Sequence, residues 1–116
     1  MRLLPLFVPL FLFLAAPAAF ADARDDARKQ VEFGITVAQR GLWREAIYRW
    51  QRATQIDPSY AAAHNNLAIA YEHEGALDKA RVAYEKAIEL EPDNSFIRQN
   101  FELFKEINDR TSRQDT

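Results

Sequence analysis

The chain has 116 residues, with 15 basic and 17 acidic side chains and a formal net charge of −2. This length allows one small domain, and the charge balance provides neither the clustered basic face that nucleic acid requires nor a polybasic membrane patch. Cysteine is absent, which excludes a disulfide framework, thiol chemistry and a lipid anchor attached through cysteine.

The first 21 residues have the pattern of a secretory signal peptide. One early positive charge at Arg2 precedes an apolar run from Leu3 to Leu14, and small residues follow at Ala19-Phe20-Ala21. The run has about 12 residues, whereas a membrane-spanning helix needs about 20. We therefore expect cleavage after Ala21 and export to the periplasm, although a cell-surface or secreted destination fits the leader equally. An uncleaved N-terminal anchor is the alternative, because the run becomes marginally long enough if it extends to Phe20.

Glycine and proline residues divide the rest of the chain into five predicted helices. Gly41 and Gly75 supply the left-handed backbone that ends a helix, and Pro58 and Pro92 cannot continue one. The expected helices span about residues 22–40, 43–56, 59–74, 77–90 and 94–109. The polar residues 111–116 are expected to form a disordered tail.

Residues 27–60 and 61–94 follow one pattern at an offset of 34 residues. The aligned pairs are Phe33 with Leu67, Gly34 with Ala68, Gly41 with Gly75, Ala46 with Ala80, Trp50 with Tyr84, Ala53 with Ala87, Ile56 with Leu90 and Pro58 with Pro92. A small residue at the eighth place, an alanine at the twentieth and a late proline make this period resemble the tetratricopeptide repeat. One departure is that Gln30 and His64 stand where the family often has tryptophan.

The resemblance implies an all-α fold, a right-handed superhelical stack of antiparallel helix pairs over residues 22–110. Two repeats would be followed by a capping helix over residues 95–110, in which Phe101 aligns with Phe33 and Leu67 at the same offset. This capping helix corresponds to the first helix of a third repeat.

Residues for catalysis or metal binding do not form a recognisable constellation. His64 and His73 are nine residues apart on one predicted helix, which turns them to opposite faces, so they cannot share a metal. Most aromatic residues fall where the repeat packs its core, and Tyr48 is the best candidate for an exposed ring. We therefore predict a protein that is not an enzyme, with no catalytic residue, metal, cofactor or small-molecule substrate.

The resemblance also implies a concave surface, lined by the second, fifth, sixth, ninth, twelfth and thirteenth residues of each first helix. From these places we predict a partner-binding set: Val31, Ile35, Asn65, Asn66, Ile69, His73, Phe96, Asn100, Leu103 and Ile107. Family members often use an asparagine at the sixth place, as at Asn66 and Asn100, to bind a peptide backbone. Relatives that clamp a peptide's C-terminal carboxylates surround this asparagine with lysine and arginine. In this chain those positions hold Val31, Ile35 and Phe96, so we do not expect a carboxylate clamp.

The last predicted helix has two apolar stripes. Ile97, Phe101 and Phe104 should face the preceding helix pair, whereas Phe96, Leu103 and Ile107 lie on a different face. We favour a non-catalytic, exported module that binds a peptide or amphipathic helix of a protein partner in a partly apolar groove. In the alternative, the second stripe packs inside the monomer or against a second copy. A homodimer would make the chain a self-associating structural subunit of a larger envelope complex.

Overall fold

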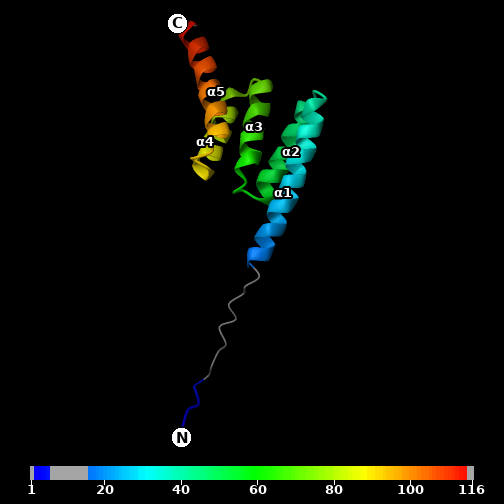
Figure 1. Ribbon diagram of the computed structural model, residues 1–116, viewed down its shortest axis with the longest axis vertical. Helices are drawn as coiled ribbons and strands as arrows, with labels where there is room; N and C mark the ends of the chain where they lie inside the picture. The colour runs from blue at the N-terminus through cyan, green and yellow to red at the C-terminus, as the bar shows by residue number, and fades with distance from the viewer. Residues whose placement is uncertain (1, 6–15, 115–116) are drawn as a thin grey trace.

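The computed structural model describes residues 2–5 and 16–114, and within them the protein has five α-helices and no strand (Figure 1). The helices are α1 (Ala16–Gln39), α2 (Trp43–Ile56), α3 (Ala61–His73), α4 (Leu77–Leu90) and α5 (Ser95–Gln114). Neighbouring helices pack as two hairpins, α1 with α2 and α3 with α4, and α5 packs against α4 at the end of the stack. The predicted all-α stack of helix pairs is therefore confirmed.

Parts of the predicted leader and tail are not among these residues. Residues 6–15, which hold most of the apolar run, and residues 115–116 lie outside the described part of the chain. Within that part, none of the helices combines the length and the apolar character needed to cross a membrane.

The two second helices, α2 and α4, have the predicted bounds, but the outer helices are longer than expected. In the described part of the chain α1 spans Ala16–Gln39, so it includes the alanine-rich stretch before Asp22, whose composition favours a helix. At the other end, the backbone of residues 111–114, expected to be disordered, is helical. No glycine or proline follows Pro92 to end α5.

Both hairpin turns use the same glycine-based helix end. Gly41 and Gly75 have φ angles of +77° and +72°, which an L-residue with a side chain adopts only under strain. After α1, the Leu42 amide donates to the Val37 carbonyl at 3.0 Å and Gly41 to Ala38 at 2.9 Å, and the turn after α3 repeats this pattern. This arrangement is a Schellman motif, which satisfies the last carbonyls of the helix.

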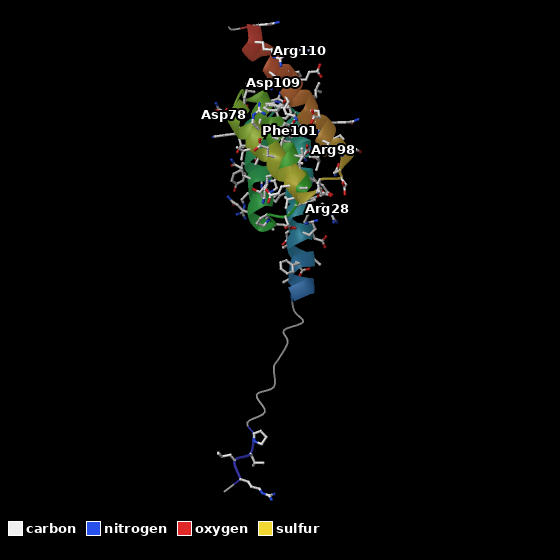
Figure 2. All side chains as sticks on the ribbon, turned by 90° about the vertical axis from the view of Figure 1, so that its left-hand side faces the viewer. Arg28, Asp78, Arg98, Phe101, Asp109 and Arg110 are labelled. Atoms are coloured by element: carbon white, nitrogen blue, oxygen red, sulfur yellow. The ribbon has the colours of Figure 1, made fainter. Side chains whose placement is uncertain are left out.

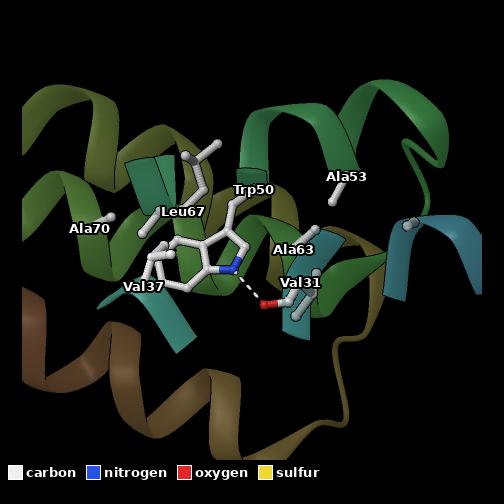
Figure 3. Packing of buried hydrophobic residues seen from close by; sticks show 9 residues of the cluster. Val31, Val37, Trp50, Ala53, Ala63, Leu67 and Ala70 are labelled. Carbon is white, nitrogen blue, oxygen red and sulfur yellow. Dashed lines mark hydrogen bonds between the residues drawn. The ribbon is translucent and has the colours of Figure 1, made fainter. Parts of the chain in front are cut away.

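The core consists largely of alanine, with a few large side chains between the helices. Ala27, Ala46, Ala53, Ala63 and Ala70 are buried in one cluster, together with Val31, Val37, Trp50 and Leu67 (Figure 3). A second cluster joins α3, α4 and α5 through Ala68, Ala80, Ala83, Tyr84 and Phe104. Ile97 and Phe104 of α5 are buried and Phe101 is half-buried, so the predicted packing face of this helix is confirmed.

Trp50 occupies the space left by a missing side chain on α1. Its indole N–H donates to the Val31 carbonyl at 3.0 Å (Figure 3), and a Cβ placed on Gly34 would lie 2.7 Å from Trp50 Cδ1. Such contacts are too short for any real Cβ, so the glycine allows α1 and α2 to approach closely. In the second repeat, Ala68 and Tyr84 stand at the equivalent places, and the smaller ring there tolerates the methyl group.

Arg24 fastens the start of α1 to the loop between the repeats. Its guanidinium donates to Asp57 Oδ2 at 2.5 Å and to Ser59 Oγ at 3.2 Å, and it lies 4.7 Å from the centre of the Tyr60 ring. Burial by itself would raise the pKa of Asp57, but hydrogen bonds from Ser59 and Arg24 outweigh it and hold this pKa below its usual value of 3.8. The loop between the repeats is thereby held against the N-terminal half of α1.

We expect Gly34→Ala to lower the free energy of unfolding by about 1–3 kcal/mol, because the new methyl group overpacks the buried indole. In a Trp50→Phe background the same change should cost less, since the smaller ring leaves room. Urea unfolding followed by circular dichroism of the four proteins measures this coupling. An equal cost in both backgrounds would show that the indole does not require the glycine.

We expect Asp57→Asn to destabilise the fold at neutral pH and to have progressively less effect in acid. A lowered pKa in the folded chain means that the ionised Asp57 adds stability above about pH 4, and this contribution is lost as pH falls through the folded-state pKa. Urea unfolding at pH 7 and pH 2.5 measures the difference. Asp25→Asn, which removes an exposed ion pair with Arg28, is the control. A destabilisation by Asp57→Asn that is independent of pH would contradict this account.

Candidate functional site

The candidate site lies on the first helices of the repeats, α1, α3 and α5. α1 contacts α3, and the Asn100 side-chain amide of α5 donates to Asn65 Oδ1 of α3 at 3.2 Å, so the three helices follow one another along the stack. Ile35, Ile69 and Leu103 stand 34 residues apart, at the ninth place of successive repeats. Eight of the ten predicted binding residues are exposed or half-buried on these helices, and we call them the first-helix face: Ile35, Asn66, Ile69, His73, Phe96, Asn100, Leu103 and Ile107.

Two of the predicted binding residues, Val31 and Asn65, are buried and cannot contact a partner. Val31 is 5% exposed and belongs to the core around Trp50, whose indole bonds to its carbonyl. Asn65 is 2% exposed and accepts the hydrogen bond from Asn100. The fifth place of the repeat therefore serves packing between successive first helices in this chain, and both residues leave the candidate set.

The second stripe of α5 is exposed. Phe96, Leu103 and Ile107 are 62%, 56% and 55% exposed, so this stripe does not pack inside the monomer. A shallow hollow of about 560 Å³ adjoins it, lined by Leu103 and by polar residues of α5 such as Arg98, Gln99 and Glu106. All of its lining residues belong to α5.

Side chains at the edge of the first-helix face are held by the second helices. Glu72 Oε2 accepts a hydrogen bond from the Tyr84 hydroxyl at 2.9 Å, and burial together with this carboxylate raises the pKa of Tyr84 far above its usual value. The Trp43 ring stacks on His73 with their centroids 3.7 Å apart and their planes at 13°. These contacts fix the end of α3 and orient the imidazole.

The two histidines have separate structural settings. His64 Nε2 lies 2.9 Å from the Pro58 carbonyl oxygen, whereas His73 stacks on Trp43. Within residues 2–5 and 16–114, no cluster of three or more His, Asp and Glu side chains is arranged to hold a metal ion.

Tyr48, predicted to be exposed, is 52% exposed.

A second hollow, which the sequence analysis missed, lies on the opposite side of α3. This outer cleft has a volume of about 570 Å³ and is formed between α2, α3 and α4. Its lining consists of Thr54, His64, Leu67, Tyr71, Asp78, Lys79, Val82, Ala83 and Lys86. The sequence contained one indication of this cleft. Val82 aligns with Tyr48 at the offset of 34 residues, so each second helix has a large apolar residue at the same exposed position.

Comparison with known proteins places both repeats in one family of sequences. Residues 61–94 match the family described as tetratricopeptide repeat, and residues 37–75 match a TPR repeat family. Together these matches span residues 37–94, which is half of the chain.

Three curated proteins resemble longer parts of the chain. The type IV pilus assembly protein PilF of Pseudomonas aeruginosa is 33% identical over 86 residues, which are 73% of this chain and 34% of PilF. The chloroplastic protein PYG7 of Arabidopsis thaliana is 27% identical over 85 residues, 28% of its length. The mouse protein O-mannosyl-transferase TMTC4 is 31% identical over 64 residues, 55% of this chain and 9% of the mouse protein. The chain thus spans about a third or less of each relative.

Proposed function

Because this chain belongs to the tetratricopeptide repeat family, whose members act as protein-interaction modules, we propose that it binds a segment of a protein partner on its first-helix face. The observation that carries the proposal is the row of aliphatic residues at the ninth place, Ile35, Ile69 and Leu103, beside the exposed Phe96 and Ile107. Apolar residues repeated at one place on three successive first helices, none of them fully buried, favour a docking site over apolar residues scattered singly.

The chemistry of this face suits an amphipathic helix or an extended apolar peptide. Covering one fully exposed aliphatic or aromatic side chain stabilises a complex by roughly 1.5–3 kcal/mol, so micromolar binding, which needs about 8 kcal/mol, requires at least four such contacts once the cost of association is subtracted. Asn66 and Asn100, which are only half-buried, offer amide groups to a peptide backbone. The aliphatic row provides no cation for a terminal carboxylate, which favours an internal segment of the partner.

The proposed activity is binding without catalysis. One relative is named as a transferase, but the similarity covers 9% of that mouse protein and gives no reason to transfer its chemistry. The similarity to a pilus assembly protein supports a role in the assembly of a larger structure. A structural subunit that associates with itself is the second candidate, favoured by the exposed apolar stripe on the terminal helix α5.

We also propose that the chain is exported and that residues 1–21 are a signal peptide. Cleavage after Ala21 would remove the first six residues of α1 and keep Arg24, which holds that helix to Asp57. Intact mass of protein recovered from an expressing Gram-negative cell should therefore correspond to a chain that begins at Asp22. Protein that retains Met1 in the cytosolic fraction would contradict export.

We expect the double variant Phe96→Glu/Leu103→Glu to lose its partner and to keep its helicity, because both side chains are exposed. The measurement is a pull-down from cell-envelope extract with the residue 22–116 chain, with circular dichroism of each variant. Tyr48→Glu, an equally exposed change on α2, is the matched control and should retain the partner. Loss of fold in the double variant would instead make the stripe a structural element of the monomer.

Sedimentation of the same proteins separates the two candidates. A monomer that captures a partner through the stripe supports the binding module. A dimer at micromolar concentration that Leu103→Glu dissociates, with no stripe-dependent partner, supports the self-associating subunit instead.

A further inference from the structure

The outer cleft has the composition of a second binding site. Its floor consists of Leu67 and Ala83, which are buried, and of the half-buried Tyr71. The Gln51 side-chain amide donates to the Tyr71 hydroxyl at 3.1 Å, so that ring is held between α2 and α4. Val82 stands at the cleft and is 66% exposed, more than any other large apolar residue from α2 to α4. The volume of about 570 Å³ is enough for one or two large side chains.

This cleft is independent of the first-helix face. His64, Leu67 and Tyr71 follow one another at i, i+3 and i+7 on α3, and at 100° per residue they point away from Ile69 and His73. In Figure 2, Asp78 of the cleft lies at one edge of the helical stack, whereas Arg28 and Arg98 of α1 and α5 lie at the other. A ligand in the outer cleft would therefore leave the first-helix face open.

The first repeat has a different pair of side chains at the equivalent place. Arg49 of α2 lies with its guanidinium carbon 4.2 Å from the centre of the Phe33 ring and pairs with Glu45 at 3.0 Å. Phe33 and Arg49 align with Leu67 and Ala83, so the arginine that lies over an apolar ring in repeat one is replaced by an alanine in repeat two. The outer cleft therefore has no arginine over its floor.

The charges at the cleft favour an acidic ligand. Lys79, Val82 and Lys86 lie at i, i+3 and i+7 along α4, which places the apolar side chain between two cations about 10 Å apart along the helix. Lys79 Nζ lies 5.8 Å from the Tyr71 ring, and Lys86 pairs with Glu89 at 3.4 Å in an exposed, readily broken ion pair. The lining residues of the cleft include one carboxylate, Asp78, and two lysines, so lysine charges outnumber carboxylate charges there.

We propose that the outer cleft binds a short acidic segment of a partner protein, with a bulky apolar side chain seated beside Val82 and carboxylates paired with Lys79 and Lys86. A helical segment with acidic residues seven positions apart and apolar residues between them matches this spacing. The chain would then hold two segments at once, one on each side of α3. Such a connector brings two partners, or two parts of one partner, together.

The test uses the peptide acetyl-Glu-Ala-Ala-Leu-Phe-Ala-Ala-Glu-amide and ¹⁵N-labelled chain, followed by NMR titration. We expect shifts that map to the outer cleft, and binding that weakens as salt rises. Val82→Glu should weaken binding about tenfold, as should Lys79→Glu/Lys86→Glu. Tyr48→Glu, at the equivalent place of the first repeat, and Leu103→Glu, on the first-helix face, should leave the affinity unchanged.

Charge reversal on both sides makes the result decisive. A peptide with lysine in place of both glutamates should bind the Lys79→Glu/Lys86→Glu variant better than it binds the natural chain. No shifts at millimolar peptide, shifts confined to the first-helix face, or binding that Val82→Glu does not weaken would overturn the proposal. A chain dimer abolished by Val82→Glu would assign the cleft to a second copy, and binding of laurate without binding of the peptide would assign it to a fatty acid. Either result would also overturn it.

Discussion

Close approach of the two helices within each repeat is the constraint on which the rest of this structure depends. In the first repeat the Trp50 indole lies directly on Gly34 and bonds to the Val31 carbonyl, and in the second Tyr84 packs near Ala68 and bonds to Glu72. One small residue and one large ring per repeat set the spacing of the helix pair. With that spacing fixed, the remaining core can consist of alanine, and the first helices of successive repeats can lie side by side.

The two sides of the helical stack have different surfaces, one formed by the first helices of the repeats and the other by the second helices. The first helices carry an aliphatic residue at the same place of each repeat, which provides a row along the stack. The second helices differ, because Arg49 lies over the Phe33 ring in repeat one, whereas Ala83 stands at the equivalent place beside the outer cleft in repeat two. Under the two proposals, a scaffold of about a hundred residues would hold partners on opposite sides of α3.

The sequence predicts the helices well, because glycine, proline and the 34-residue period act locally. The bounds of α2 and α4 follow from these signals alone. Burial depends instead on the neighbouring repeat, so Val31 and Asn65 were assigned to a binding face although adjacent helices cover them. Phe33 is exposed and its equivalent Leu67 is buried for the same reason, because no helix among the described residues packs over Phe33 as α2 packs beside α3. The outer cleft depends on α2, α3 and α4 together, so the sequence indicates only the outward apolar residue Val82 and not the cleft beside it.

Hydrogen–deuterium exchange of the chain with and without its captured partner tests the central claim that the first-helix face is the principal binding surface. The account predicts slower exchange in peptides from α3 and α5 that contain Ile69, Leu103 and Ile107, and unchanged exchange in α2. Slower exchange confined to α2 and α4, with α5 unaffected, would contradict it and place the partner on the other side of the stack.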